Sequence, residues 1–318
     1  MNRARPTVLN SSRYYPAVYA LAVAGGVFAR FDYRLFALAS KCVGLCVPSG
    51  VRCQVELLAD TRFCFELRDF YWNRLIASAF NYEPEILLVL DLFKDIPYGF
   101  VDCGANYGFW SLIASSHPFG AHRVIAIEAL TSTFRWLERN VTLNARDIKT
   151  VRAAVTERPN ERKIIYERGR HAGASLDEAW LGNDRPLSQT EPVETVSLDA
   201  LLENNPEFAQ RPRIIKLDIE GEEVNALAGG RTALSQDAMV IYEEYGEEIE
   251  CKTTKFILDS FSLRVFFVDD RKRVLNIQTI DQVRMIKTHR TRGYNFVAVT
   301  PNSIFDERLS HLAEKRAE

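Results

Sequence analysis

Short apolar runs separated by polar stretches recur along the chain and predict the strands of one sheet. Five runs alternate with amphipathic stretches such as 131–144; they cover residues 98–101, 123–128, 150–155, 213–219 and 239–242. Apolar strands that alternate with helices are typical of a parallel sheet covered on both faces. Two later runs, 265–268 and 295–299, are expected to close the sheet as an antiparallel pair. The pattern predicts an α/β fold with a doubly wound, mostly parallel, seven-stranded sheet.

The amino-terminal third has a different pattern. Residues 14–29 and 35–47 are mostly apolar and predict packed helices, and residues 51–67 alternate as in a β-hairpin. A membrane span needs about 20 apolar residues, so no integral span is expected. A peripheral membrane or partner contact, or a targeting segment, is the alternative to packed helices. Residues 69–82 are rich in aromatic side chains, which are expected to form either core or a substrate platform.

These patterns divide the chain into three parts. We expect an N-terminal extension of helices and a hairpin over residues 1–98, a cofactor-binding domain over residues 99–300, and a charged C-terminal tail over residues 301–318. The total of 318 residues is long for one domain but suits one domain with an extension.

The stretch at residues 100–108 is the most informative about chemistry. An apolar strand ends in Asp102, Gly104 and Gly108 form a turn, and a helix-like segment begins at Phe109. This is the layout of a nucleotide-type site. The dinucleotide fingerprint binds a pyrophosphate, but a carboxylate two residues before Gly104 would repel one. A cationic ligand such as S-adenosylmethionine fits better, and an NAD-linked oxidoreductase is disfavoured.

Acidic residues also end two of the other predicted parallel strands. Glu128 follows the second strand, 24 residues after Gly104, which is near the spacing at which an acid binds ribose hydroxyls. Asp218 follows the fourth strand. Because ligands of open α/β sheets bind at the carboxyl ends of the strands, Asp102, Glu128 and Asp218 predict a ligand site at that edge.

Five segments, in this order, resemble the FkbM-type methyltransferases, which are class I S-adenosylmethionine-dependent enzymes: Asp102–Gly108, Ile125–Glu128, Ala153–Val155, Ser197–Asp199 and Ile215–Glu223. The resemblance covers roughly residues 80–300. It implies a Rossmann-like fold, S-adenosylmethionine as the cofactor, O-methylation of a sugar, glycan or natural-product hydroxyl, and an extension that acts as a lid. Ala129 departs from the family, where proline commonly follows the ribose-binding acid, but a proline would only stiffen the loop.

The motifs and the resemblance together assign the cofactor-binding residues: Asp102, Cys103, Gly104, Ala105, Asn106, Gly108, Glu128, Ala129, Ala153 and Asp218. Methyl transfer to a hydroxyl needs an in-line geometry and gains from a positioned base. The candidates for that base are Asp218, Glu243 and His171, which lies in the glycine-containing loop 168–175. Asp218 could instead bind the methionine ammonium, and Glu220 could either line the site or cap the next helix.

Composition narrows the possible partners, metal sites and cellular locations of the protein. The net charge of −2 and the interspersed charges give no reason to expect nucleic acid, so a small-molecule or glycan acceptor is expected. The six cysteines have no zinc-type spacing and no histidine lies near them, so no metal site is assigned, and reduced thiols favour a cytoplasmic protein. Two alternatives stay open: a methyltransferase of a lipid, polyketide or protein side chain, and a non-catalytic scaffold. The glycines and acids of the turn favour an enzyme.

Overall fold

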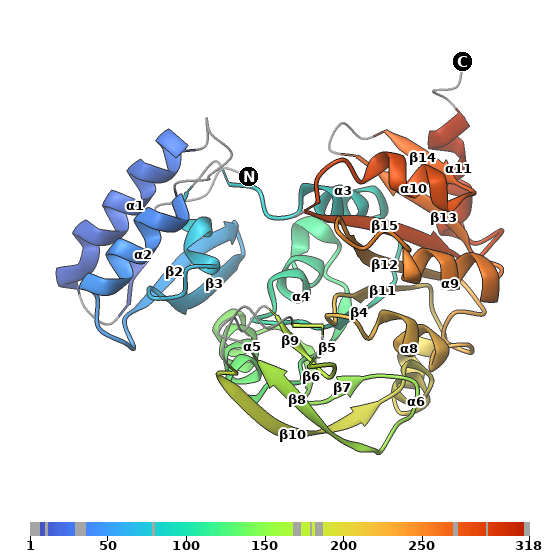
Figure 1. Cartoon of the computed structure of the whole chain (residues 1–318), viewed down its shortest axis with the longest axis horizontal. Coiled ribbons are helices and arrows are strands. Elements are labelled where there is room, and N and C mark those ends of the chain that lie inside the picture. Colours follow the sequence, from blue (N-terminus) through green and yellow to red (C-terminus); the bar gives the residue numbers. More distant parts are fainter. Residues whose placement is uncertain are drawn as a thin grey trace.

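The computed structural model describes residues 7–9, 12–28, 36–77, 80–167, 173–178, 180–181, 187–269, 273–290 and 292–314. The chain forms an N-terminal unit of two helices and a small sheet, which lies beside a larger α/β unit (Figure 1). One hydrophobic core contains residues of both units, so the two are packed together.

The larger unit is built on an eight-stranded sheet with the order β14-β13-β15-β12-β11-β4-β5-β6. Five neighbouring strands are parallel: β4 (Gly99–Cys103), β5 (Arg123–Ile127), β6 (Ile148–Val151), β11 (Arg213–Leu217) and β12 (Ala238–Tyr245). Three are antiparallel to their neighbours: β13 (Arg264–Val268), β14 (Val274–Ile277) and β15 (Gly293–Val299). The expected α/β sheet and its antiparallel closing pair are confirmed, and β14 adds an eighth strand to the seven expected.

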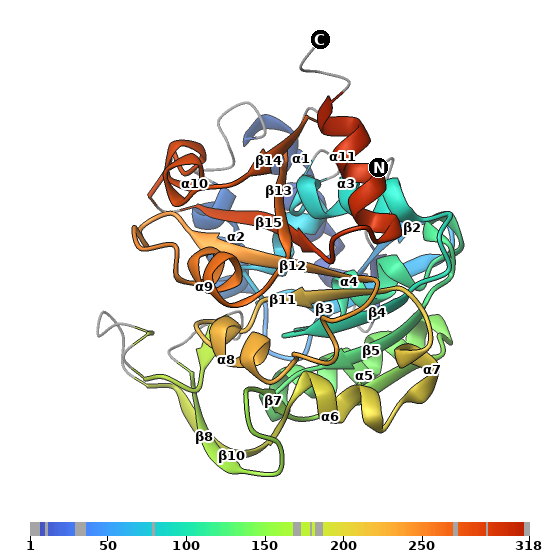
Figure 2. The same cartoon turned by 90° about the vertical axis from the view of Figure 1, so that its right-hand side faces the viewer.

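Helices cover both faces of this sheet (Figures 1 and 2). On one face Phe100 and Ile214 share a core with α3 (Pro84–Phe93), α4 (Phe109–Ala114), α5 (Thr131–Asn144) and α11 (Ile304–Glu314). On the other, Val101 and Ile215 share a core with α6 (Leu198–Glu203), α7 (Pro206–Ala209), α8 (Glu223–Ala228), α9 (Lys252–Ser260) and α10 (Ile280–Ile286). Because neighbouring residues of one strand point to opposite faces, continuous apolar runs supply both cores.

The run 150–155, expected as one strand, is two strands in different sheets. β6 ends at Val151, and β7 (Ala154–Val155) pairs instead with β10 (Gln189–Val196). β10 pairs with β8 (Arg162–Glu167), and β8 pairs with β9 (Ala174–Ser175), which gives a four-stranded sheet. Strands β8 and β10 lie on either side of the loop 168–175 in the sequence. Residues 168–172 of that loop, His171 among them, lie outside the described residues.

The N-terminal unit contains the expected helices and hairpin. Helices α1 (Tyr15–Phe28) and α2 (Phe36–Cys46) pack beside the sheet of β1 (Thr7–Val8), β2 (Arg52–Leu58) and β3 (Thr61–Glu66). The aromatic segment that follows includes the short 3-10 helix η3 (Trp72–Ile76). Among the described residues, no helix has both the length and the apolar character required for a membrane crossing.

Part of the segment expected as a C-terminal tail is helix α11. Its residues Phe305 and Leu309 are fully buried, and the ring of Phe305 lies 5.3 Å from the ring of Phe93 in α3. Residues 304–314 therefore pack on the larger unit, and the expected boundaries at residues 98 and 300 stay predictions.

Two asparagines of α5 join the N-terminal unit to the larger one. The Oδ1 atom of Asn140 accepts from the Cys64 amide (2.8 Å), and its Nδ2 donates to the carbonyls of Cys64 (3.1 Å) and Tyr107 (2.9 Å). One helical turn later, Asn144 makes the same pair of bonds with the backbone of Arg62, both at 2.7 Å. Because β3 ends its sheet, these amides replace a neighbouring strand and satisfy its backbone.

We predict that Asn140→Ala destabilises the protein by about 2–4 kcal/mol, because it leaves buried backbone groups of Cys64 and Tyr107 without partners. Asn144→Ala is the matched control, since its bonds to Arg62 are exposed and water can replace them; its cost should stay near about 1 kcal/mol. Urea unfolding of both variants measures the two costs. Equal losses of unfolding free energy in the two variants would show that the buried hydrogen bonds of Asn140 do not stabilise the contact between the two units.

Candidate functional site

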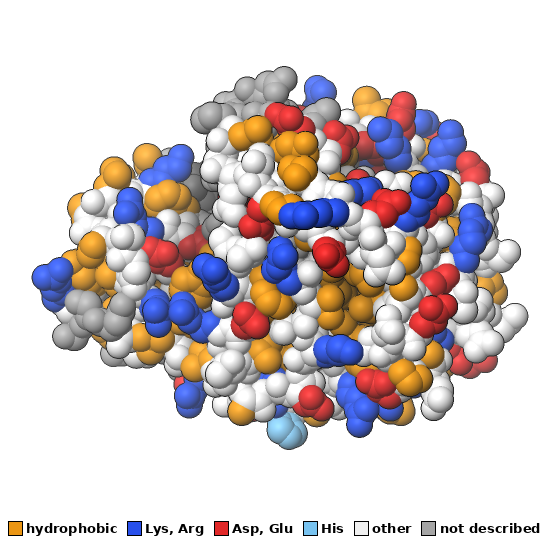
Figure 3. All heavy atoms as spheres, turned by 90° about the horizontal axis from the view of Figure 1, so that it is seen from below, with side chains coloured by type: hydrophobic (Ala, Val, Ile, Leu, Met, Phe, Trp, Pro, Cys, Tyr) orange, Lys and Arg blue, Asp and Glu red, His pale blue; other side chains and the backbone are white. Residues whose placement is uncertain are grey.

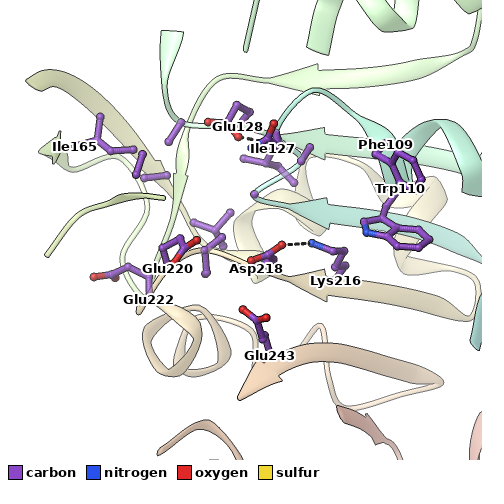
Figure 4. Close-up of a pocket in the computed structure, with 18 of the residues that line it drawn as sticks. Phe109, Trp110, Ile127, Glu128, Ile165, Lys216, Asp218, Glu220, Glu222 and Glu243 are labelled. Atoms are coloured by element: carbon purple, nitrogen blue, oxygen red, sulfur yellow. Dashed lines mark hydrogen bonds and ion pairs between the residues drawn. The ribbon is translucent and has the colours of Figure 1, made fainter. Parts of the chain in front are cut away.

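The candidate site lies where the order of strand connections reverses. From the centre of the sheet, β4 leads outward to β5 and β6 on one side, whereas β11 leads to β12 on the other. Ligands of doubly wound sheets bind in the crevice at such a point. A cavity of about 250 Å³ is present there (Figure 4). Its walls come from the carboxyl ends of the parallel strands, the four-stranded sheet and the aromatic segment before α3.

Most of the residues expected to bind a cofactor line this cavity: Gly104, Ala105, Asn106, Glu128, Ala129, Ala153 and Asp218. Of the candidates for the base, Asp218 and Glu243 line it, and His171 lies outside the described residues. Asp102, Cys103 and Gly108 are placed behind the wall. Asp102 accepts a hydrogen bond from Ser111 Oγ at 2.6 Å, Cys103 belongs to the core below the sheet, and Gly108 precedes α4.

The turn after β4 has a conformation that only glycine fits at position 104. Gly104 has φ +76°, and a Cβ there would lie 1.8 Å from the carbonyl oxygen of Asp218. The amides of Gly104 and Ala105 both donate to the Ile127 carbonyl, at 3.0 and 2.8 Å. The Asp218 amide donates in turn to the Cys103 carbonyl at 3.1 Å. Backbone contacts thus hold the ends of three strands against one another.

Glu128 is held by two backbone amides. Its Oε2 accepts from Asn106 N and its Oε1 from Leu130 N, both at 2.9 Å. Asn106 itself has a left-handed backbone, with φ +51°. The carboxylate therefore has one fixed orientation between the turn after β4 and the start of α5, at the cavity wall.

An ion pair between a buried lysine and a half-buried aspartate lies in the cavity wall. Lys216, which is 2% exposed, donates from Nζ to Asp218 Oδ2 at 2.8 Å (Figure 4). Burial alone would lower the pKa of this ammonium, but the carboxylates of Asp218, Asp102 and Glu83 raise its pKa above the usual range. Lys216 is therefore charged at neutral pH. It faces Asp102 across the ladder between β4 and β11.

Carboxyl groups outnumber this ammonium around the cavity. Among the lining residues that the structure describes, Lys216 is the one cation beside six acids: Glu83, Glu128, Asp218, Glu220, Glu222 and Glu243. Burial raises the pKa of Glu83 to about 8 and that of Glu220 to about 8, and the Asp218 charge adds to both shifts. Burial, Asp218 and Glu83 raise the pKa of Glu243 to about 9. Such a cavity favours a cationic ligand.

Of the two glutamates that follow each other in β12, only Glu243 faces the cavity. Its carboxylate points toward Asp218 (Figure 4) and lies over Gly293 of β15, where a Cβ would be 1.4 Å from Oε1. Glu244 points to the opposite face, as alternation along a strand requires. There it accepts from the amide (2.7 Å) and hydroxyl (2.8 Å) of Thr254.

Glu220 does not have the helix-capping role considered for it, because the N-cap position of α8 is Glu222 and no side-chain capping hydrogen bond is made there. The Glu223 carboxylate accepts from the amides of Ile219 and Gly221, both at 3.1 Å, and so satisfies the turn before α8. Glu220 has φ +52°, accepts from Trp180 Nε1 at 3.2 Å and lines the cavity.

Aromatic side chains form the remaining wall: Tyr71, Trp72, Tyr82, Phe109 and Trp110. The rings of Trp72 and Phe109 are stacked at 5.9 Å, and Trp110 Nε1 donates to Glu83 Oε2 at 2.8 Å. The hydroxyls of Tyr71 and Tyr82 are hydrogen-bonded at 2.7 Å. Tyr71, Trp72 and Tyr82 precede the large sheet in sequence. The aromatic segment is thus both packed core and part of the cavity wall.

Sequence reasoning missed Lys216 and Glu83. A lysine inside an apolar strand and a glutamate before a helix proline have no local signal of function, apart from the place of Lys216 two residues before Asp218. Only the folded chain brings both to the acids of the cavity.

Comparison with known proteins gives one match along the sequence. Residues 102–296, more than half of the chain, match the family model described as "Methyltransferase FkbM domain". No curated protein matches the chain.

Three similar solved structures are an FkbM methyltransferase from Methylobacillus flagellatus KT, the METTL16 MTase domain, and precorrin-6y C5,15-methyltransferase from Geobacter metallireducens GS-15. The first has 16% identity and a TM-score of 0.39, covering 90% of this chain and 58% of that one. The second has 14% identity and a TM-score of 0.42, covering 92% and 96%. The third has 14% identity and a TM-score of 0.37, covering 67% and 86%.

We predict that Glu243→Gln stabilises the ligand-free protein, with a gain that grows between about pH 5 and about pH 9. The carboxyl, with its pKa raised from 4.5 to about 9 by burial, keeps its proton in the folded state while the unfolded chain ionises. Folding stability therefore falls as pH rises through this window, by at most about 1.4 kcal/mol per pH unit, and the glutamine variant avoids that loss.

Urea unfolding of wild type and Glu243→Gln at several pH values measures the gain, with the exposed Glu138→Gln as the charge-matched control. A difference that does not change with pH would contradict the raised pKa.

Proposed function

The chain belongs to the FkbM methyltransferase family of S-adenosylmethionine-dependent enzymes, and we propose that it transfers a methyl group to a hydroxyl of a sugar, glycan or other natural product. The observation that supports this most is the acidic cavity at the switch point of the sheet, where Lys216 is the one cation among the described lining residues. A sulfonium cofactor and a neutral acceptor both suit that charge.

The chemistry of the cavity fits S-adenosylmethionine. Gly104 lets the turn after β4 pack directly against the Asp218 carbonyl at the cavity wall. The surplus of carboxylates would attract the ammonium and the sulfonium of the cofactor. We propose that the cofactor is held by the lining residues Gly104, Ala105, Asn106, Glu128, Ala129, Ala153 and Asp218, with Glu128 at the ribose hydroxyls. Asp102, Cys103 and Gly108 would act through the conformation of the same turn.

When bound, S-adenosylmethionine supplies a methyl group on a good leaving group. The protein then has to orient the acceptor, exclude water and take up the hydroxyl proton. The aromatic wall of Tyr71, Trp72 and Tyr82 would exclude water. We assign proton uptake to Glu243, because Asp218 already accepts a hydrogen bond from Lys216 at 2.8 Å. Burial raises the pKa of Glu243 to about 9, so this carboxyl keeps its proton until a positive sulfur binds nearby. That charge would lower the pKa and free the carboxylate to take up the hydroxyl proton.

The charge of the cavity also limits the acceptor class. A phosphate or carboxylate on the acceptor would meet Glu83, Asp218 and Glu243, and Lys216 is the one cation among the described lining residues that could balance it. A neutral polyol or an amino sugar avoids that repulsion, and the aromatic rings offer an apolar surface for its ring. We therefore propose a sugar-like acceptor rather than nucleic acid. All six cysteines are free thiols, which supports our proposal of a cytoplasmic location.

We predict that S-adenosylmethionine and S-adenosylhomocysteine bind the protein in isothermal titration calorimetry. Gly104→Ala should abolish binding, because its Cβ would displace the Asp218 backbone. Glu128→Gln should weaken binding by about 1.5–3 kcal/mol, the range for hydrogen bonds to a charged group, whereas the exposed Glu138→Gln should leave it unchanged. Binding of NADH in place of S-adenosylhomocysteine would refute the cofactor assignment.

We predict different steady-state kinetic defects for the two acids when the cofactor concentration is varied at saturating acceptor. Glu243→Gln should lower kcat and kcat/KM alike, by about 10²–10⁴-fold, because a base acts only in the transition state. Asp218→Asn should mainly raise the KM for the cofactor. Mass spectrometry of the product, with a panel of neutral, amino and phosphorylated sugars, identifies the methylated atom. Full activity of Glu243→Gln would remove it as the base, and transfer to nitrogen would refute O-methylation.

A further inference from the structure

The solvent-facing side of α1 is apolar over residues 15–23. Tyr15, Tyr19 and Val23 follow one another at intervals of four residues and are 43%, 67% and 52% exposed. Residues four apart in a helix lie on one face, and the opposite face packs inward through the buried Val18 and Leu21. Helix α1 contains no charged residue. A water-exposed helix face normally carries charges, so this one is unusual.

Helix α2 also exposes apolar side chains to solvent. It packs against α1, and the pair lies on the side of the N-terminal unit away from the large sheet (Figure 1). Its exposed residues include Leu38 (61%) and Leu45 (82%), with Lys41 between them. We call Tyr15, Tyr19, Val23, Leu38 and Leu45 the outer helical face.

Basic residues gather in the same part of the chain. Residues 1–46 contain six basic residues and one acid, a net charge of +5, whereas the other 272 residues carry −7. Arg13 precedes Tyr15 by two residues, Lys41 lies between Leu38 and Leu45, and both basic residues are exposed. In the view from below, hydrophobic and basic side chains appear together on the N-terminal side of the molecule (Figure 3). Apolar side chains beside excess positive charge are the composition of a surface that binds anionic lipid.

We propose that the outer helical face docks on an anionic lipid bilayer, with α1 and α2 lying in the headgroup region. Helix α1 has 14 residues and is therefore about 21 Å long, shorter than a hydrocarbon core of about 30 Å. It suits the interface rather than a crossing. Tyrosine side chains such as Tyr15 and Tyr19 also prefer that interface. A second copy of the chain is a poorer occupant, since two segments of charge +5 would repel.

The test is co-sedimentation of the full chain with vesicles of phosphatidylcholine alone and of equimolar phosphatidylcholine and phosphatidylglycerol. Wild type should bind only the anionic vesicles. Tyr19→Glu combined with Leu45→Glu should weaken that binding at least about tenfold. Arg13→Gln and Lys41→Gln should each weaken it about fivefold. The matched control is Leu275→Glu combined with Met285→Glu, which adds the same charge at exposed apolar residues of the larger unit and should bind as wild type does.

Two further measurements separate membrane binding from misfolding of the variant and from dimerisation. Tyr19→Trp places a fluorophore on the outer helical face. The difference in emission between this variant and wild type, which has four tryptophans of its own, should shift to the blue on anionic vesicles even if the glutamate variant fails to fold. Analytical ultracentrifugation without lipid tests the other occupant. No binding to anionic vesicles by wild type would overturn the proposal, as would a dimer that the Tyr19→Glu and Leu45→Glu variant dissociates.

Discussion

One buried ammonium, that of Lys216, organises the charges of the cavity. It pairs with Asp218 at 2.8 Å and also faces Asp102 and Glu83, which come from different segments of the chain. A buried charge without a partner is costly, so the strands β4 and β11 have to hold these groups in register. Among the described lining residues, a single ammonium cannot balance all the acids. Burial, with the Asp218 charge added, raises the pKa values of Glu83 and Glu243. The surplus of acids is the reason to expect a cationic ligand.

The backbone around the ion pair leaves little freedom for the site. Gly104 lies against the Asp218 carbonyl, and its amide donates to Ile127 at the end of the next strand. Glu128 is fixed by amides on both sides of it. The site is therefore built on rigid strand ends, and the aromatic segment closes it from the N-terminal unit, which Asn140 of α5 ties to the larger unit through the backbone of β3. Rigid placement of this kind is what an in-line displacement requires.

Local sequence signals were sufficient for the parallel strands, the antiparallel closing pair and the turn after β4, because hydrophobic alternation and glycine placement act over few residues. Local sequence signals failed where the structure depends on pairing between residues far apart in the sequence. The run 150–155 has no glycine or proline to mark its break, yet β7 pairs with β10 rather than continuing β6. In the same way, Lys216 and Glu83 meet only through the fold, since 133 residues separate them. Asp102 was expected at the ligand, but the pleat directs it to Ser111.

The central claim is that the surplus of acids in the cavity forms a site for a cation. Calorimetric titration near pH 7 in buffers of different ionisation enthalpy measures how many protons leave when a ligand binds. A bound sulfonium would lower the raised pKa of Glu83, Glu220 and Glu243. Binding of S-adenosylmethionine should therefore release on the order of one proton, and more than S-adenosylhomocysteine, which lacks the positive sulfur. Equal release by the two ligands, or proton uptake with S-adenosylmethionine, would contradict the claim.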